Sequence, residues 1–189
     1  MDAAQVKAYF ESVASEWDSM RLAWYDERVI EELAERAHTT PSSTVIDVGT
    51  GTGFVTAGLA PRVAHVVAVD QAPAMLAVAR RNFGKLGVDN VELREADIAS
   101  LPLSTDSVDA AVANMVLHHA ESPAAVLGEM ARVTKPGGWV AVTDAVEHPY
   151  EWMRTEHADL WLGFREDQVA DFFAAARLAH YGYAPLGMQ

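Results

Sequence analysis

Apolar residues in the first 40 positions recur at the spacing of a single helix face. They form two stripes: Val6, Phe10, Val13 and Trp17, followed by Val29, Ile30, Leu33 and Ala37. Pro41-Ser42-Ser43 ends this periodicity, because proline and serine favour turns. The pattern therefore predicts a helical cap over residues 1–40.

Beyond Pro41, short apolar runs alternate with segments of helical character. The runs predict strands over 44–48, 65–69, 91–93, 108–112 and 139–143. The segments between them predict helices over 54–59, 73–85 and 123–133, the last two with proline in the first turn. Strands that are apolar on both faces and alternate with helices indicate a parallel sheet covered on both sides. We therefore predict a Rossmann-like, doubly wound α/β fold with a mostly parallel sheet.

Polar residues stand at or just beyond the carboxyl ends of the predicted strands. They are Asp47, Asp70, Asp97, Asn114 and Asp144. In a doubly wound sheet these ends share one rim, and ligands bind there. We expect these residues to gather around a single site.

The glycine run Gly49-Thr50-Gly51-Thr52-Gly53 joins the first strand to a helix and lets a ligand approach the backbone closely. The run is not a phosphate loop, and the dinucleotide fingerprint would need glycine where Phe54 stands. Asp47 would repel a pyrophosphate but suits the sulfonium and ammonium groups of S-adenosylmethionine (SAM). Asp70 is placed to accept hydrogen bonds from a ribose diol.

Composition limits the function classes further. The 189 residues, 50% of them hydrophobic, predict one domain over 1–189, with the cap at 1–40, a ligand-binding core at 44–144 and substrate-side helices with a last strand at 145–189. The absence of cysteine excludes disulfides and thiolate chemistry. Without an apolar run of bilayer length or a signal peptide, we expect a cytoplasmic protein with no membrane partner. A net charge of −13 argues against nucleic-acid binding.

Five segments together resemble class I SAM-dependent methyltransferases in order and spacing. They are VIDVGTGTGF, VVAVD, EADIASLPL, DAAVANMVLHHAESP and RVTKPGGWVAVTD. The sequence is most similar to the small-molecule branch that includes ubiquinone/menaquinone-type enzymes, and to methyltransferase domains attached to ArsR-type regulators. The resemblance covers residues 9–182. It implies transfer of a methyl group from SAM to a small-molecule acceptor, with S-adenosylhomocysteine (SAH) as the product.

The resemblance also implies a set of cofactor-binding residues. The set is Tyr9, Asp47, Gly49, Thr50, Gly51, Thr52, Gly53, Asp70, Gln71, Met75, Ala96, Asp97, Ile98, Asn114 and Met115. Within it, Asp47 and the glycines would meet the methionine half, Asp70 the ribose and Asp97 the adenine. Arg21 is a weaker candidate for the cofactor carboxylate.

His118 and His119 are the candidate catalytic residues, because histidine titrates near neutral pH and could take a proton from an acceptor. The alternative is that they only shape the pocket. No metal site is expected, since neighbouring histidines rarely face one ion and no third ligand is spaced with them.

The segment 144–163 follows the last predicted strand, where this family builds its substrate pocket. Its candidate pocket residues are His148, Tyr150, Trp152, His157 and Trp161. An aromatic pocket could hold a flat apolar acceptor and exclude water. The alternative is an amphipathic helix in which Trp152 and Trp161 belong to the core.

Two other function classes stay open. One is a regulatory protein that binds SAM or SAH without catalysis, and the other is a nucleotide-dependent oxidoreductase. The family usually ends with two antiparallel strands, and residues 178–184 could supply only the first. We therefore expect an incomplete C-terminal β-hairpin, with a sheet edge that a homodimer could cover.

Overall fold

The computed structural model describes residues 2–187 and contains one five-stranded parallel sheet with the order β3-β2-β1-β4-β5. The strands are β1 Thr44–Val48, β2 His65–Asp70, β3 Val91–Glu95, β4 Val108–Asn114 and β5 Thr134–Thr143. The order reverses direction at β1, so that β2 and β4 lie on either side of it. This topology confirms the predicted doubly wound fold.

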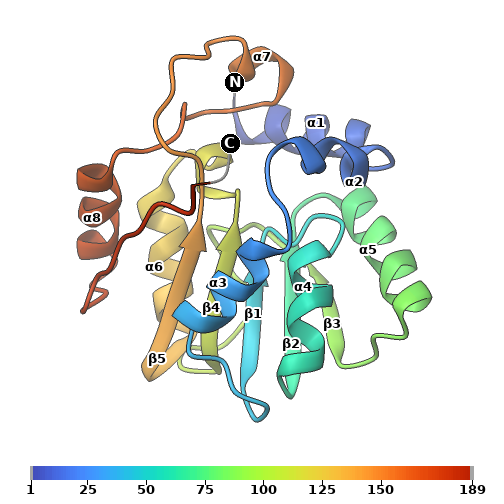
Figure 1. Cartoon of the computed structure of the whole chain (residues 1–189), viewed down its shortest axis with the longest axis vertical. Coiled ribbons are helices and arrows are strands. Elements are labelled where there is room, and N and C mark those ends of the chain that lie inside the picture. Colours follow the sequence, from blue (N-terminus) through green and yellow to red (C-terminus); the bar gives the residue numbers. More distant parts are fainter. Residues whose placement is uncertain (1, 188–189) are drawn as a thin grey trace.

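Helices surround the sheet on both faces (Figure 1). They are α1 Ala3–Val13, α2 Trp17–Met20, α3 Arg28–Arg36, α4 Phe54–Leu59, α5 Pro73–Leu86, α6 Pro123–Val133, α7 Met153–Glu156 and α8 Glu166–Ala175, with 3₁₀ turns at Arg21–Ala23, Ala60–Arg62 and Leu117–His119. Along β1, Val45 packs with α3 and α4, whereas Ile46 packs with α6 on the opposite face. Both residues are fully buried, as expected for a strand covered on two sides.

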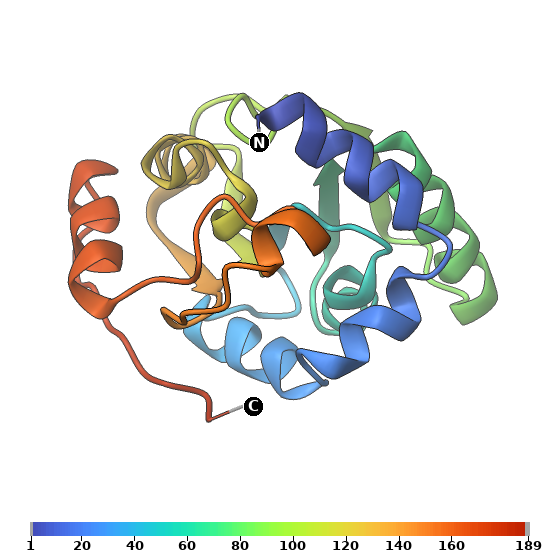
Figure 2. The ribbon, with the colours of Figure 1, turned by 90° about the horizontal axis from the view of Figure 1, so that it is seen from above.

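The carboxyl ends of the strands lie under the N-terminal helices and the segment that contains α7 (Figures 1 and 2). The N-terminal cap is helical, as predicted, although a 3₁₀ turn follows α2 directly. No helix within residues 2–187 is both long and apolar enough to cross a membrane.

Three segments differ from the sequence-based expectations. Strand β5 begins at Thr134, not at Trp139, and the register shift in its pairing with β4 accommodates Pro136-Gly137-Gly138. Residues 178–184 contain no strand, so the prediction of a last strand in this segment is wrong. The backbone there turns at Arg177 and His180, whose φ angles are +59° and +57°. Between β5 and α8, helix α7 is only one turn long, and the rest is loop.

Candidate active site

The turn between β1 and α4 brings backbone amides to the rim of the sheet. Gly49, Gly51 and Gly53 have φ angles of +72°, +56° and +87°, which side chains other than glycine rarely adopt. Space is also restricted, because a Cβ on Gly49 would lie 2.5 Å from Val116. The amide groups of Gly49 and Thr50 donate to the Val69 carbonyl at 2.8 and 2.9 Å. The turn is therefore fixed to the end of β2.

Asp47 is buried at the end of β1 and has no cationic partner among the described residues. Its Oδ2 accepts a hydrogen bond from the Thr56 hydroxyl at 2.6 Å, and the Thr50 and Thr56 hydroxyls are 3.0 Å apart. Burial raises the pKa of Asp47 to about 6, although these hydroxyls oppose the shift. A cationic group beside Asp47 would stabilise its charged form.

Asp70 lies at the end of β2 and holds two backbone amides. Its Oδ2 accepts from Gly51 N at 2.8 Å, and its Oδ1 accepts from Ala72 N at 2.9 Å. Burial raises the pKa of Asp70, while the hydrogen bonds from backbone amides work in the other direction. A carboxylate has about four lone-pair positions, so Asp70 can still accept from a ligand.

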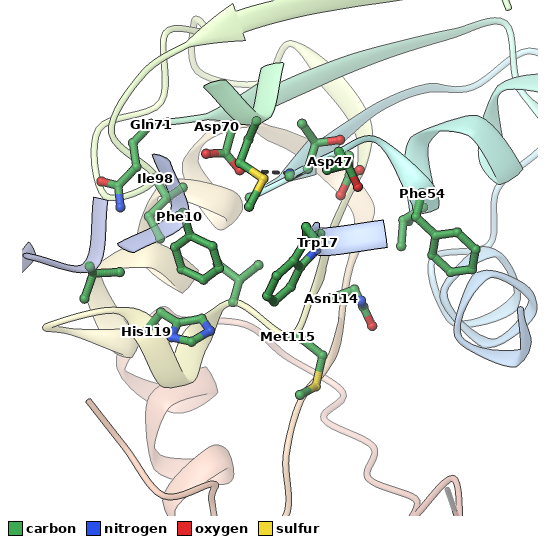
Figure 3. A pocket seen from close by; sticks show the side chains of 18 of the residues that line it. Phe10, Trp17, Asp47, Phe54, Asp70, Gln71, Ile98, Asn114, Met115 and His119 are labelled. Carbon is green, nitrogen blue, oxygen red and sulfur yellow. Dashed lines mark hydrogen bonds between the residues drawn. The ribbon is translucent and has the colours of Figure 1, made fainter. Parts of the chain in front are cut away.

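Both carboxylates line one cavity, whose volume including its mouth is about 710 Å³ (Figure 3). Twelve of the predicted cofactor-site and catalytic residues line it: Asp47, Gly49, Thr50, Gly51, Thr52, Asp70, Gln71, Met75, Ile98, Asn114, Met115 and His119. The described lining contains no lysine or arginine. The cavity is therefore apolar and acidic, without the basic groups that commonly bind phosphate.

The N-terminal cap closes one side of this cavity. Phe10 and Trp17 line it with their rings 5.3 Å apart, and Phe10 also meets the His119 ring edge-on at 4.8 Å. Asp18 fixes the cap to the glycine turn, because the Thr52 hydroxyl donates to Asp18 Oδ1 at 2.6 Å. The Asn82 amide donates to Asp18 Oδ2 at 3.0 Å from α5.

The end of β4 provides another part of the wall. Met115 has a φ angle of +54°, and its amide donates to the Thr143 carbonyl at 2.8 Å. The side-chain oxygen of Asn114 accepts from the Thr143 hydroxyl at 2.7 Å. Met115, with its left-handed backbone conformation, turns the chain at the cavity wall. Such conformations cluster at functional sites.

The two histidines of the 3₁₀ turn after β4 have different environments. His119 lines the cavity, and burial, together with the neighbouring His118, holds its pKa well below the usual value. His118 is buried behind it, with Nδ1 2.6 Å from Asp144 Oδ1. Burial alone would lower the pKa of His118, but the charges of Asp144 and Asp159 raise it overall. Of the two, only His119 can meet a ligand in the cavity.

Comparison with known proteins identifies the family. A model of the methyltransferase domain matches residues 46–142, from β1 through most of β5. The chain belongs to this family of methyltransferases.

Relatives and solved structures agree with that assignment. The methyltransferase is 34% identical to a demethylmenaquinone methyltransferase of Clavibacter sepedonicus, over 84% of this chain and 64% of that protein. It is 38% identical to an arsenite methyltransferase of Halobacterium salinarum, over 59% of this chain and 29% of that protein. A crystal structure of a SAM-dependent methyltransferase from Aquifex aeolicus superposes with a TM-score of 0.66 at 25% identity, covering 93% of this chain and 88% of that one. The predicted resemblance to class I SAM-dependent methyltransferases is thereby confirmed.

The methyltransferase spans less than two thirds of the length of either of these two relatives. Their names differ in the acceptor, arsenite in one and demethylmenaquinone in the other. The names of these relatives therefore do not identify the acceptor of this chain.

Several predicted cofactor contacts lie outside the cavity lining of the methyltransferase. Asp97 is exposed and accepts a hydrogen bond from Ala99 N at 2.8 Å, and Ala96 is beside it. The Tyr9 hydroxyl is 3.3 Å from His157 Nδ1. Gly53 caps α4. The roles that the resemblance implies for these four residues stay predictions.

Arg21 does not face the cavity either. Its guanidinium lies over the ring of Phe54, 3.5 Å from the ring centroid, and it is not a lining residue. The cap contributes apolar residues instead. Val6, Phe10 and Trp17, which helical periodicity assigns to packing, line the cavity as well.

None of the five predicted acceptor-pocket residues lines the cavity. Trp161 packs in the core against Phe164 and Phe172, and its Nε1 donates to the Ala120 carbonyl at 2.9 Å. The alternative core role proposed for Trp161 fits this packing. The other four, His148, Tyr150, Trp152 and His157, form a chain of neighbouring rings in the segment around α7.

Proposed function

We propose that this methyltransferase transfers the methyl group of SAM to a small-molecule acceptor by direct displacement. The observation that carries the proposal is the cavity at the rim of the sheet, which combines the glycine turn with two buried carboxylates and has no basic lining residue. Such a lining suits a ligand with cationic groups and no phosphate. It disfavours a dinucleotide or a nucleoside triphosphate.

Each half of the cofactor has matching residues. Asp47 would face the cationic methionine half, and Asp70 would accept from the ribose hydroxyls through its remaining lone pairs. Met75 and Ile98 offer apolar surface for the adenine. Phe10 and Trp17 of the cap would then separate the bound cofactor from water.

The reaction needs little from the protein beyond alignment and exclusion of water. A lone pair of the acceptor forms a bond to the methyl carbon, and the electron pair of the carbon–sulfur bond leaves with sulfur, giving neutral SAH. His119 is the candidate base in the cavity wall. Its lowered pKa keeps it neutral near pH 7, so that it can accept a proton from the acceptor.

The acceptor is proposed to be a small, flat, apolar molecule, because the rings of Phe10 and Trp17 line the cavity. An arsenic acceptor is disfavoured, since the chain contains no cysteine thiol to bind it.

We also propose a cytoplasmic location without nucleic-acid partners, and a homodimer through the edge strand β5. Sedimentation of a monomer at micromolar concentrations would contradict the dimer.

Calorimetric titration with SAH tests the proposed function, with NADH and ATP as competing ligands. We expect SAH to bind and NADH and ATP not to bind. Asp70→Asn should weaken SAH binding at least tenfold, which corresponds to about 1.4 kcal/mol. The matched control is Asp171→Asn on the exposed surface of α8, which should bind SAH normally. Absence of SAH binding by the folded protein would contradict the proposal.

Turnover separates the enzyme from the regulatory alternative. We expect methyl transfer, measured as SAH released from SAM, with at least one acceptor from a panel of hydroquinones and phenols. Tight SAM binding without release of SAH across the panel would favour a regulatory protein.

A further inference from the structure

Three side chains from two distant parts of the chain meet beside the cavity. His118 and His119 come from the 3₁₀ turn after β4, and Asp159 comes from the loop after α7. One donor atom from each lies within 4.8 Å of the other two. Oδ1 of Asp159 is 3.8 Å from Nε2 of His118 and 3.8 Å from Nδ1 of His119.

The carboxylate of Asp159 is the unusual member of this cluster. The residue is 3% exposed, and its Oδ1 has no hydrogen-bond partner among residues 2–187. Buried polar atoms in proteins are nearly always satisfied, and an isolated buried charge is costly. The position of this oxygen between two imidazoles therefore points to a cation that all three groups can share.

Neighbouring groups hold the cluster in place. Nδ1 of His118 is 2.6 Å from Asp144 Oδ1, which orients the ring and leaves Nε2 facing Asp159. A carboxylate behind a histidine is the usual support of a metal ligand. Ala158 is buried with a φ angle of +62°, a strained conformation that places Asp159 toward the histidines.

We propose that His118, His119 and Asp159 bind a divalent transition-metal ion of the Zn²⁺ type. Two imidazole nitrogens and one carboxylate oxygen are a preferred donor set for such ions. Bonds of about 2.0–2.2 Å put ligand atoms of one ion roughly 3–3.5 Å apart. The two distances to Asp159 Oδ1, now 3.8 Å, would shorten by less than about 1 Å, and no pair of donor atoms, all within 4.8 Å of one another, would have to close by more than about 1.8 Å. Nδ1 of His119 would leave the Ala158 carbonyl, now 3.1 Å away, to bind the ion. The imidazole ring would then carry its proton on Nε2.

Adjacent histidines alone gave no reason to expect a metal, because no third ligand is near them in sequence. The fold supplies that ligand. Asp159 also borders a second hollow, lined by Gln5, Arg154, Thr155 and Leu160, through which an ion could reach the cluster from solvent. The ion would tie the turn after β4 to the loop after α7.

Binding of the ion does not depend on the proposed function, but its effect on His119 does. With Nδ1 on the metal, His119 would present an N–H donor to the cavity and could not act as the base. Metal loading would then change turnover without being needed for SAH binding.

Cobalt titration tests the site. Co²⁺ would be added to untagged, chelator-treated protein and followed by its visible absorption, which is intense for four- and five-coordinate ions. We expect one equivalent to bind to the wild type, with Asp159→Asn and His119→Gln each weakening it at least tenfold. The matched control is His65→Gln at the start of β2, which should bind cobalt like the wild type. Zn²⁺ should raise the melting temperature of the wild type and not that of Asp159→Asn.

Two results would overturn the metal site: no cobalt binding by folded wild-type protein, or equal affinity in wild type, Asp159→Asn and His119→Gln. SAH calorimetry on the same samples keeps the two proposals apart. SAH binding without cobalt binding removes only the metal site. Cobalt binding without SAH binding removes only the proposed function.

Discussion

Asp47 carries a buried carboxyl group in the cavity wall, and from this we predict that SAH binding depends on pH. Its pKa is raised to about 6 by burial. The ammonium group of SAH would favour the ionised form of Asp47 and lower that pKa in the complex, so a proton must leave on binding below pH 6. We expect SAH affinity to be constant above about pH 7 and to fall up to tenfold per pH unit below about pH 6. Calorimetry across this range measures the change.

The control for this prediction is Asp47→Asn, which keeps the shape of the side chain and removes its titration. It should bind SAH more weakly at pH 7 and lose most of the pH dependence. If the wild type and Asp47→Asn changed in parallel with pH, another group would be responsible.

At the same scale, some site residues could be predicted from the sequence and others could not. The positions of Asp47 and Asp70 in the cavity wall were predictable, because the ends of parallel strands share a rim and the glycine run marks a tight turn at that rim. Phe10 and Trp17 could not be assigned to the cavity, since the same helical stripe packs against the fold and lines the cavity. The proximity of His118 and Asp159 depends on the path of the loop after α7, which the spacing of apolar residues does not predict.

At the scale of elements, buried strands and their helices were predicted closely. Strand β1 and helix α4 have the predicted bounds. Gly49 follows β1 and Gly53 precedes α4, while Pro41 and Pro61 stand within three residues of their other ends. The start of β5 was missed because Pro136-Gly137-Gly138 resembles a turn, whereas an edge strand with a register shift tolerates it. Residues 178–184 look strand-like, but in the structure they make no strand pairing.

The short helix α2 provides a prediction at this scale. Its Asp18 binds both Thr52 and Asn82, so loss of the carboxylate should release the cap from the glycine turn. We expect Asp18→Ala to weaken SAH binding about fivefold, equivalent to about 1 kcal/mol, mostly by faster dissociation. Stopped-flow fluorescence of the cap tryptophans measures the rate.

Asp26→Ala is the matched control, because Asp26 lies in the same region but pairs, among residues 2–187, only with nearby Arg28. Its SAH dissociation rate should equal that of the wild type. An unchanged rate in Asp18→Ala would mean that apolar packing of Phe10 and Trp17 alone holds the cap closed.

At the scale of the whole molecule, the cavity lies between parts of the fold that are distant in sequence. Its wall is made by the cap, by the rim of the sheet and by the turn after β4. A ligand that binds only the folded state stabilises all of them, by about 2.7 kcal/mol at a concentration 100 times its dissociation constant. For a chain of this size we expect SAH to raise the melting temperature by roughly 5–10 °C. Asp70→Asn should lose this shift, and NADH should not produce it in either protein. A rise with SAH that survived in Asp70→Asn would place the ligand elsewhere, because Asp70 holds both the glycine turn and the start of α5 at the rim where we place the cofactor.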